Sequence, residues 1–186
     1  MGLKLEHVSY LYGTDTELLV RALDDVNLEL RYDGEGLQHM ILNGSDVTEE
    51  IRTPEMSRVA SLISAQPAVR AFLLDLQRDM AKRYSVMMDG RDIGTVVLPG
   101  ADVKVYLTAS PEVRARRRLG DLEAQGLTVS YEQVLEEIRQ RDHQDMTRSI
   151  APLKQAKDAV VLDTSSLNQE ESLAALKAIV EERIAR

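Results

Sequence analysis

The segment VKVYLTASPEVRARRR, Val103–Arg118, decides the fold that we expect for this chain. Its first part, Val103–Leu107, is rich in β-branched and aromatic residues, which is typical of a strand. Ser110 and Pro111 predict the start of a helix, because a serine cap followed by proline at the first helical position is a common N-terminal pattern. A strand that leads directly into a helix favours an α/β fold.

The same alternation of strands and helices continues on both sides of this segment. Further strands are predicted at Ser85–Met88 and Val160–Leu162, and helices at 67–83, 111–125, 130–144 and Leu173–Ile184. The helix over 130–144 begins with the capping box formed by Ser130 and Gln133. The pattern therefore predicts an open parallel sheet that is covered on both faces by helices.

The region before this alternation has a different pattern. Strands are predicted at Leu3–Tyr12 and Val26–Tyr32, where apolar and polar residues alternate, and a short helix at Glu17–Leu23. The turn Asp33–Gly36 then makes Gln38–Leu42 a hairpin partner of the second strand. Thr53 and Pro54 predict the start of a further helix that ends near Ser64.

Composition and charge restrict the class of protein. The net charge of −8 argues against a general nucleic-acid binder. No cysteine is present, so disulfides, zinc–thiolate sites and a cysteine nucleophile are excluded. The three histidines lack metal-ligand spacing, and no apolar run reaches the roughly 20 residues of a membrane span. We expect a cytoplasmic protein with no metal ligands of its own, no nucleic-acid partner and no membrane partner.

Arginines are concentrated in the second half of the chain. They occupy positions 114, 116, 117 and 118, and then 139, 141 and 148. A guanidinium group offers a planar set of donors that matches phosphate oxygens, so this pattern is compatible with a phosphate site. A solvated helix face is the alternative interpretation of the run RARRR.

The tetrapeptide DGRD, Asp89–Asp92, is a second candidate feature. It follows a predicted strand, and ligands in open α/β sheets bind beyond the carboxyl ends of the strands. Gly94 comes just after it and would allow the backbone to approach a ligand closely. A tight turn that caps the next segment is the alternative interpretation.

Six segments carry a stronger signal when they are taken together. In chain order they are LNGSDVTEEIRTPE (Leu42–Glu55), SRVAS (Ser57–Ser61), PAVR (Pro67–Arg70), DGRDIGTVVLP (Asp89–Pro99), VKVYLTASPEVRARRR (Val103–Arg118) and RDHQDMTRSIAPLKQAKDAVVLDT (Arg141–Thr164). In this order and spacing they resemble the bacterial cytidylate kinase, or (d)CMP kinase, family. The resemblance implies one domain over residues 42–186, with a P-loop-kinase-like parallel sheet flanked by helices.

The resemblance also implies an acceptor site for CMP or dCMP. Ser61, Arg70 and Asp92 match positions that read the cytosine in the family. Arg141 and Asp145 match positions around the sugar and the phosphate. The chemistry agrees, because a carboxylate, an arginine and a serine can together read the donor and acceptor edge of a cytosine.

A second group of residues is implied to act on the transferred phosphate. Arg91 and Arg148 match phosphate-binding arginines, and Arg118 matches the lid that closes over ATP. Arg114 and Arg117 are its neighbours on the same basic helix and are implied to bind ATP with it. The cosubstrate implied by the family is ATP with Mg²⁺, and the implied oligomeric state is a monomer.

The beginning of the chain departs from the family pattern. The family begins with a strand, a GxxxxGK[ST] loop and a helix, and no such loop occurs in these 186 residues. Residues 1–41 are predicted to form an atypical segment of strand, helix and hairpin, so we expect a fold that is N-terminally truncated or rearranged. Residues 1–30 weakly resemble the opening strands of an ABC-transporter ATPase subunit, although 21–30 are equally compatible with a variable region of the kinase family.

Three functions remain open from the sequence. The first is a kinase that transfers the γ-phosphoryl group of ATP to CMP or dCMP. The second is a non-catalytic protein that binds pyrimidine nucleotides, because these 186 residues do not contain the phosphate-binding loop that P-loop kinases use. The third is a structural fragment without nucleotide binding.

Overall fold

A computed structural model describes residues 21–53, 56, 60 and 66–185. The chain divides into two compact units, Met1–Ser85 and Val86–Arg186, and each is described by itself. The strand predicted at Leu3–Tyr12 lies outside the described residues. The same holds for most of the helix predicted from Thr53 to Ser64, although Thr53 Oγ1 accepts a hydrogen bond from the Met56 amide at 3.2 Å, as an N-cap would.

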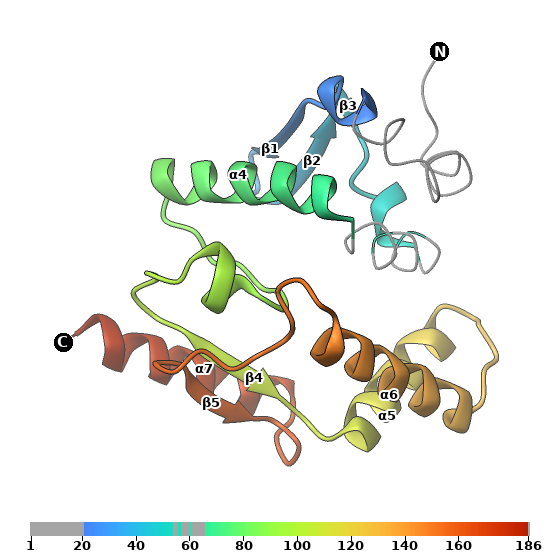
Figure 1. The fold of residues 1–186 in the computed structure, drawn as a ribbon. Coiled ribbons are helices and arrows are strands. Elements are labelled where there is room, and N and C mark those ends of the chain that lie inside the picture. The colour runs from blue at the N-terminus through green and yellow to red at the C-terminus, as the bar shows by residue number, and fades with distance from the viewer. Residues whose placement is uncertain (1–20, 54–55, 57–59, 61–65, 186) are drawn as a thin grey trace. The chain divides into compact units, whose positions relative to one another are not determined.

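The first unit contains a small antiparallel sheet with strand order β1-β2-β3 (Figure 1). Its strands are β1 (Leu28–Tyr32), β2 (Gln38–Leu42) and β3 (Ser45–Asp46). In β1 and β2 the register pairs Leu28 with Leu42 and Tyr32 with Gln38, which confirms the predicted hairpin. The turn depends on Gly36, whose φ of 81° is in the left-handed region that favours glycine. The short helix η1 (Glu50–Arg52) follows the sheet.

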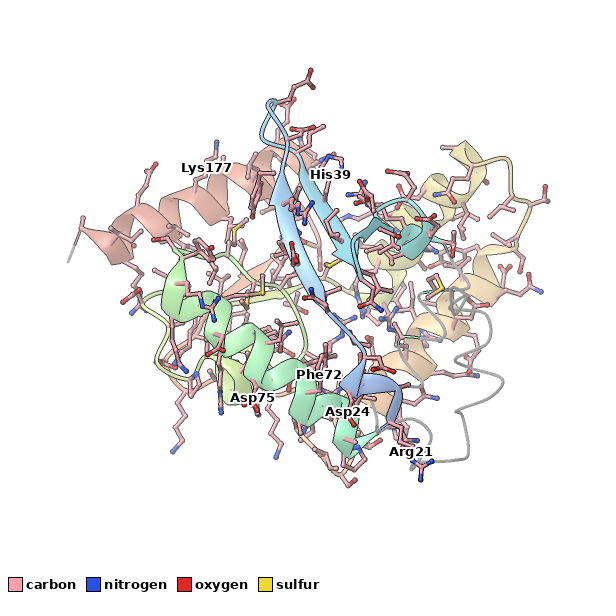
Figure 2. The ribbon with its side chains drawn as sticks, turned by 90° about the horizontal axis from the view of Figure 1, so that it is seen from above. Arg21, Asp24, His39, Phe72, Asp75 and Lys177 are labelled. Atoms are coloured by element: carbon pink, nitrogen blue, oxygen red, sulfur yellow. The ribbon has the colours of Figure 1, made fainter. Side chains whose placement is uncertain are left out.

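Helix α4 (Pro67–Arg83) closes the first unit and confirms the helix predicted over 67–83. It begins with proline at its first position and ends with Lys82 and Arg83, whose charges favour a helix C-terminus. Figure 2 shows Phe72 and Asp75 among its side chains. Val69 of this helix is buried, as is Ile41 of β2.

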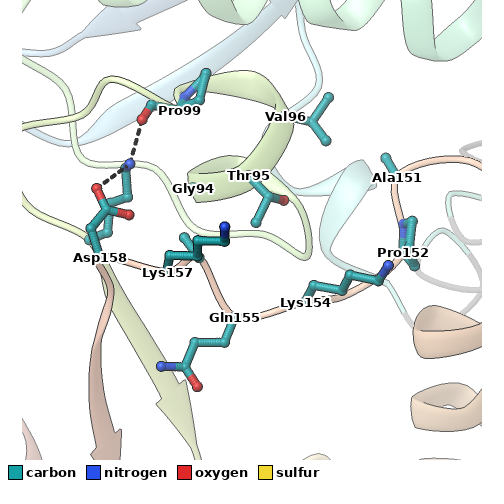
Figure 3. A pocket seen from close by; sticks show the side chains of 12 residues that line it. Gly94, Thr95, Val96, Pro99, Ala151, Pro152, Lys154, Gln155, Lys157 and Asp158 are labelled. Atoms are coloured by element: carbon teal, nitrogen blue, oxygen red, sulfur yellow. Dashed lines mark hydrogen bonds and ion pairs between the residues drawn. The ribbon is translucent and has the colours of Figure 1, made fainter.

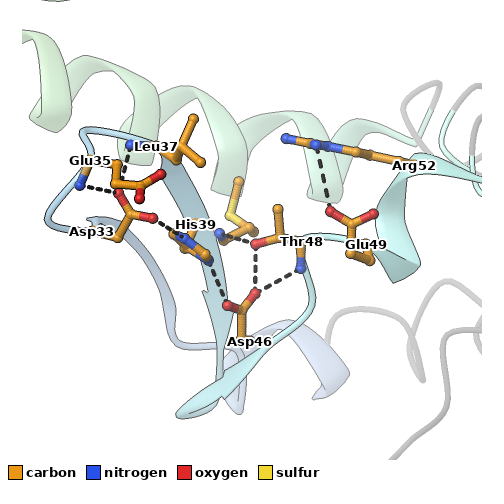
Figure 4. Close-up of polar contacts among 9 residues, drawn as sticks. Asp33, Glu35, Leu37, His39, Asp46, Thr48, Glu49 and Arg52 are labelled. Carbon is orange, nitrogen blue, oxygen red and sulfur yellow. Dashed lines mark hydrogen bonds and ion pairs between the residues drawn. The ribbon is translucent and has the colours of Figure 1, made fainter.

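His39 on β2 lies between two carboxylates (Figure 4). Its Nδ1 is 2.7 Å from Asp46 Oδ2, and its Nε2 is 3.4 Å from Asp33 Oδ2. The hydrogen bond to Asp46 and the weaker one to Asp33 raise the pKa of His39 above its ordinary value of 6.5. Two hydrogen bonds from Thr48, followed by the one from His39, lower the pKa of Asp46 to about 2. The imidazolium form of His39 therefore stabilises the hairpin.

We expect the His39 ring to titrate above pH 6.5 in the folded chain. Because the folded pKa is the higher one, this stabilisation is fully present below the unfolded pKa and is lost as the pH rises through the folded pKa. An NMR titration of the His39 ring protons measures the midpoint. Asp46→Asn should lower the midpoint more than Asp33→Asn, since Asp46 is the closer partner. A midpoint at or below 6.5 would contradict the described geometry.

The second unit is an α/β structure built on a two-stranded parallel sheet (Figure 1). Strand β4 (Val105–Thr108) pairs with β5 (Val160–Asp163), and Thr108 lies opposite Asp163. The helices of this unit are α5 (Pro111–Ala124), α6 (Tyr131–Thr147) and α7 (Gln169–Ile184). The predicted α/β class, with a parallel sheet flanked by helices, is confirmed.

The prediction of a strand at Ser85–Met88 is wrong. These residues have no ladder partner, and Met87 is 92% exposed. A strand requires a hydrogen-bonded neighbour, and within the described residues β4 pairs only with β5. The sheet is also less completely covered than expected, because the apolar side chains of Leu107 and Val161 are exposed.

Helices α5 and α6 form a hairpin with a small core of its own. Ala115 and Leu122 of α5 and Val134 of α6 are buried, and four apolar neighbours pack against them: Leu119, Tyr131, Leu135 and Ile138. The apolar residues recur every three or four positions, which places them on one face of each helix. Ser130 and Gln133 form the predicted capping box at the start of α6.

Candidate phosphate-binding site

Four charged residues of the second unit converge at the end of α6. Arg148 is the C-cap of α6, and Asp145 lies one turn before it. Arg91 and Asp92 come from the loop that leads into the π-helical turn η2 (Ile93–Val97). The helix contributes its pair because positions three apart lie on the same face. The cluster of Arg91, Asp92, Asp145 and Arg148 is called the arginine–aspartate cluster below.

Asp145 lies between the two guanidinium groups of this cluster. Its Oδ2 accepts a hydrogen bond from Arg91 Nε at 2.7 Å, and its Oδ1 is 4.0 Å from Arg148 Nη1. The Oδ1 of Asp92 is 3.5 Å from Arg148 Nη2. The side chains of Asp92, Asp145 and Arg148 are largely buried, while that of Arg91 is more open. Two carboxylates therefore compensate two guanidinium groups and hold them side by side.

Each arginine is fixed through its Nε atom. Arg91 donates a hydrogen bond from Nε to Asp145, and Arg148 donates one from Nε to the carbonyl of Ala151 at 2.7 Å. Among the described residues, the Nη groups of both arginines have no hydrogen-bond partner, and the buried Arg148 Nη2 has only its 3.5 Å ion-pair contact with Asp92. A buried donor without a partner costs about 1–3 kcal/mol, and more when it is charged. These Nη groups are thus positioned to donate to an anion.

The backbone of η2 positions Asp92 at the edge of the cluster. The carbonyl of Asp92 accepts from the amides of Thr95, Val96 and Val97 at 3.3, 2.8 and 3.2 Å. Three amides on one carbonyl fix the orientation of the peptide that carries the Asp92 side chain. The turn predicted as one interpretation of DGRD is thus present, and it supports the charged residues.

Arg141 lies on the same face of α6, four residues before Asp145 and seven before Arg148. Its side chain is exposed, and no hydrogen bond or ion pair links it to the described residues. Of the residues predicted around the sugar and phosphate, the structure therefore brings Asp145 into the cluster and places Arg141 on the adjoining surface. Their roles toward a nucleotide stay predictions.

Two arginines predicted to bind ATP have structural partners. Arg114 makes a bidentate ion pair with Asp142 of α6, with Nη1–Oδ1 and Nη2–Oδ2 distances of 2.9 and 2.6 Å. This pairing raises the pKa of Arg114, so its charge is retained. Arg117 donates from Nη2 to the carbonyls of Thr164 and Leu167 at 2.6 and 3.0 Å. Both arginines thus fasten α5 to neighbouring segments.

Arg118, also predicted at the lid, is exposed and makes no hydrogen bond or ion pair with the described residues. The same is true of Arg116. Guanidinium donors in this state fit the oxygens of a triphosphate.

Arg118→Ala is expected to affect ligand binding, whereas Arg117→Ala is expected to affect stability. With the ATP role that the resemblance implies for Arg118, its loss should weaken ATP binding by about tenfold, because one charge-assisted hydrogen bond would be lost, and should leave stability within about 0.5 kcal/mol. Loss of Arg117 should lower the free energy of unfolding by about 1–3 kcal/mol, because two backbone carbonyls lose their donor. Calorimetric titration with ATP and urea denaturation measure the two effects. Equal destabilisation by both variants would contradict this division.

The residues predicted to read the cytosine are only partly described. Ser61 lies outside the described residues. Arg70 belongs to α4 of the first unit, whereas Asp92 belongs to the second. Their shared role stays a prediction that follows from the resemblance.

The described residues offer neither a metal-binding cluster nor a membrane-spanning helix. They contain no group of three or more histidine, cysteine or acidic residues that could hold a metal ion. None of the helices in this part of the chain combines the length and apolar character needed to cross a membrane.

Some residues of the site were missed by the sequence analysis. Thr164 is buried, donates to the Thr108 carbonyl at 3.2 Å and accepts from Arg117, so it joins β4, β5 and α5. Asp142, the partner of Arg114, was also missed. Its position one turn before Asp145 could have signalled an inward-facing carboxylate, but nothing in the sequence marks Thr164.

Comparisons with known proteins show which proteins this chain is similar to. A family model of cytidylate kinases matches residues 9–182. The cytidylate kinase of Caldicellulosiruptor saccharolyticus is 45% identical over 173 residues, which is 93% of this chain and 76% of the relative. That of Carboxydothermus hydrogenoformans is 47% identical over 166 residues, covering 89% and 74%. That of Mycobacterium leprae is 53% identical over 143 residues, covering 76% and 64%.

The parallel sheet with flanking helices, together with the family match, defines an α/β protein of the P-loop-kinase-like class. Within that class, the chain belongs to the cytidylate kinase family. The match begins at residue 9, so it extends further toward the N-terminus than the expected start at residue 42. The predicted similarity of residues 1–30 to an ABC-transporter ATPase is not confirmed, and the family match includes 21–30.

Proposed function

We propose that this chain binds CMP or dCMP and phosphorylates it with MgATP to give CDP or dCDP. The observation that carries the proposal is the state of Arg91 and Arg148. Both guanidinium groups are anchored through Nε, and their Nη groups have no hydrogen-bond partner among the described residues. The names of the relatives, which are cytidylate kinases, support the choice of nucleotide.

In the proposed reaction, Arg91 and Arg148 hold the phosphate of CMP. Their charges reduce the repulsion between the acceptor phosphate and the incoming phosphoryl group. An oxygen of the CMP phosphate forms the new bond to the γ-phosphorus, and the bond to the β–γ bridging oxygen breaks to leave ADP. Asp145 acts as a positioning residue, because it fixes Arg91 by a 2.7 Å hydrogen bond.

The cosubstrate is proposed to lie beside α5. MgATP supplies the γ-phosphoryl group and the charge of the metal ion. Arg118 and Arg116 fit its phosphates, because both are exposed and lack partners in the described part of the chain. A Mg²⁺ ion in kinase sites is held largely by phosphate oxygens and water, with one or two carboxylates. The proposed lid is the α5–α6 hairpin.

The cytosine is proposed to be read by Ser61, Arg70 and Asp92, as the family resemblance implies. A carboxylate can accept from the exocyclic amine of cytosine, and UMP carries an oxygen at that position. The proposal therefore includes a preference for CMP over UMP.

A second candidate is nucleotide binding without turnover. It is favoured by one observation, which is that these 186 residues contain no GxxxxGK[ST] loop. Such a loop supplies backbone donors and a lysine to the transferred phosphate.

Formation of ADP and CDP from MgATP and CMP distinguishes the two candidates. The purified chain is assayed by chromatography of the products, with UMP as a second acceptor and Arg148→Ala as a matched variant. Production of CDP that the substitution abolishes supports the kinase. Binding of CMP without CDP supports the second candidate, and absence of both overturns the proposal.

A further inference from the structure

A pocket of about 390 Å³ in the second unit lies outside the arginine–aspartate cluster (Figure 3). One wall consists of residues 94–96 of η2 together with Pro99. The other wall is the segment 151–158, which connects α6 to β5, except for Leu153. This volume is within the lower range of small-molecule sites.

Three lysines line this pocket. Lys104 is a wall residue: its side chain is 8% exposed, its Nζ is 2.7 Å from Asp158 Oδ2, and it also donates to the Pro99 carbonyl. Lys154 and Lys157 are exposed, and neither makes an ion pair with a carboxylate of the described residues. The ammonium groups of these two lysines are therefore available to a ligand.

The charge of the pocket favours a dianion. Asp158 compensates Lys104, so the charges of Lys154 and Lys157 leave a local excess of positive charge in a chain whose net charge is −8. A phosphate monoester carries about −1.5 to −2 charges at neutral pH and binds readily to lysine. In Figure 3 the Lys157 side chain extends toward Thr95, whose hydroxyl adds a polar group to this side.

The shape of the pocket suits a ligand with a small organic part. Val96, Pro152 and Ala156 give it apolar lining. Gly94 leaves space at its base, since a Cβ there would lie 3.5 Å from Cδ of Lys104 and 3.8 Å from Cβ of Ala156. The chain bends at Ala151, which has a φ of 48° and whose carbonyl accepts the hydrogen bond from Arg148 Nε.

We propose that this pocket binds a phosphate-bearing small molecule through Lys154 and Lys157, separately from the acceptor phosphate at the arginine–aspartate cluster. The site is built by the ion pair between the buried Lys104 and the exposed Asp158 and by the bend at Ala151. The proposal does not depend on turnover, so it can hold or fail independently of the proposed kinase activity.

The test is an NMR titration of the ¹⁵N-labelled full chain with inorganic phosphate and, separately, with ribose 5-phosphate. We expect saturable shifts of the Gly94, Thr95 and Lys157 amides. A stronger effect of ribose 5-phosphate would identify a phosphomonoester as the ligand class, and an equal effect would identify the free anion. The double variant Lys154→Gln/Lys157→Gln should weaken the binding at least about tenfold.

Two matched variants control for charge and for the other site. Lys177→Gln removes an exposed lysine of α7 (Figure 2) and should leave the response unchanged. Arg91→Ala removes one guanidinium group of the cluster and should retain the response that depends on Lys157. Non-saturable shifts, or an unchanged affinity in the double variant, would overturn the proposal. Circular dichroism verifies that each variant is folded.

Discussion

Replacing Arg148 with alanine is expected to weaken CMP binding by about 10- to 100-fold, since a hydrogen bond to a charged group contributes about 1.5–3 kcal/mol. Arg148 Nη2 is buried and has no hydrogen-bond partner among the described residues, so a bound phosphate would satisfy it. The affinity is measured by calorimetric titration with CMP, which does not require turnover. If the chain is an active kinase, kcat/KM should fall by about 10²–10³-fold, the size of effect expected when a preorganised donor is removed.

Two further variants separate ligand binding from structure. Arg148→Lys keeps the charge but lacks the planar set of donors, so it should recover only part of the affinity. Arg183→Ala removes an exposed arginine of α7 and should not change CMP binding. Because Arg148 also holds the Ala151 carbonyl, thermal unfolding of each variant is compared. Unchanged CMP affinity in folded Arg148→Ala would refute the acceptor site proposed here.

Leu122→Ala is expected to lower the free energy of unfolding of the α5–α6 hairpin by about 2–5 kcal/mol. Leu122 is 8% exposed and packs in the only buried apolar cluster that joins these two helices among the described residues. The large effect follows because the cluster is small and its neighbours cannot fill the space that leucine leaves.

Urea denaturation followed by circular dichroism measures this loss. Leu173→Ala on α7 is a matched control, since Leu173 is 52% exposed and should change stability by less than about 0.5–1 kcal/mol. Equal midpoints for the Leu122 variant and the unsubstituted chain would show that the hairpin is held together by its ion pairs instead. Those pairs are Arg114 with Asp142 and Arg139 with Glu112.

Local signals in the sequence predicted most helices and strands well. Ser110 with Pro111, and Ser130 with Gln133, marked the starts of α5 and α6 because capping depends on neighbouring residues only. A similar box at Asn168 and Glu171 places the start of α7 earlier than the predicted Leu173. Ser85–Met88 failed because strand formation depends on a distant partner that composition does not reveal.

The candidate site was predictable only in part. The order of motifs indicated Arg91, Asp92, Asp145 and Arg148 through the family resemblance. The predicted helix ended at residue 144, whereas α6 extends to Thr147, so the placement of Asp145 on this helix and of Arg148 at its cap was not predicted. Which arginines serve structure could not be predicted, because Arg114 and Arg117 differ from Arg118 only in what lies opposite them in space. The same limit applies to the pocket of Lys154 and Lys157, because the facing wall comes from residues 94–96, which are distant in the sequence.

The insertion of the whole α5–α6 hairpin between β4 and β5 has a consequence for the order of folding. Val105 pairs with Val160, so the parallel pair must close a long loop before its hydrogen bonds form. The hairpin contains mostly local contacts, which form quickly. Once the hairpin has formed, two contacts place β5 beside β4. These contacts run from Arg117 to Thr164 and from the Ser110 amide to Ser165. The hairpin would then act as the folding nucleus, because it reduces the length of free chain between the two strands. Destabilising substitutions in the hairpin would therefore slow refolding more than they speed unfolding.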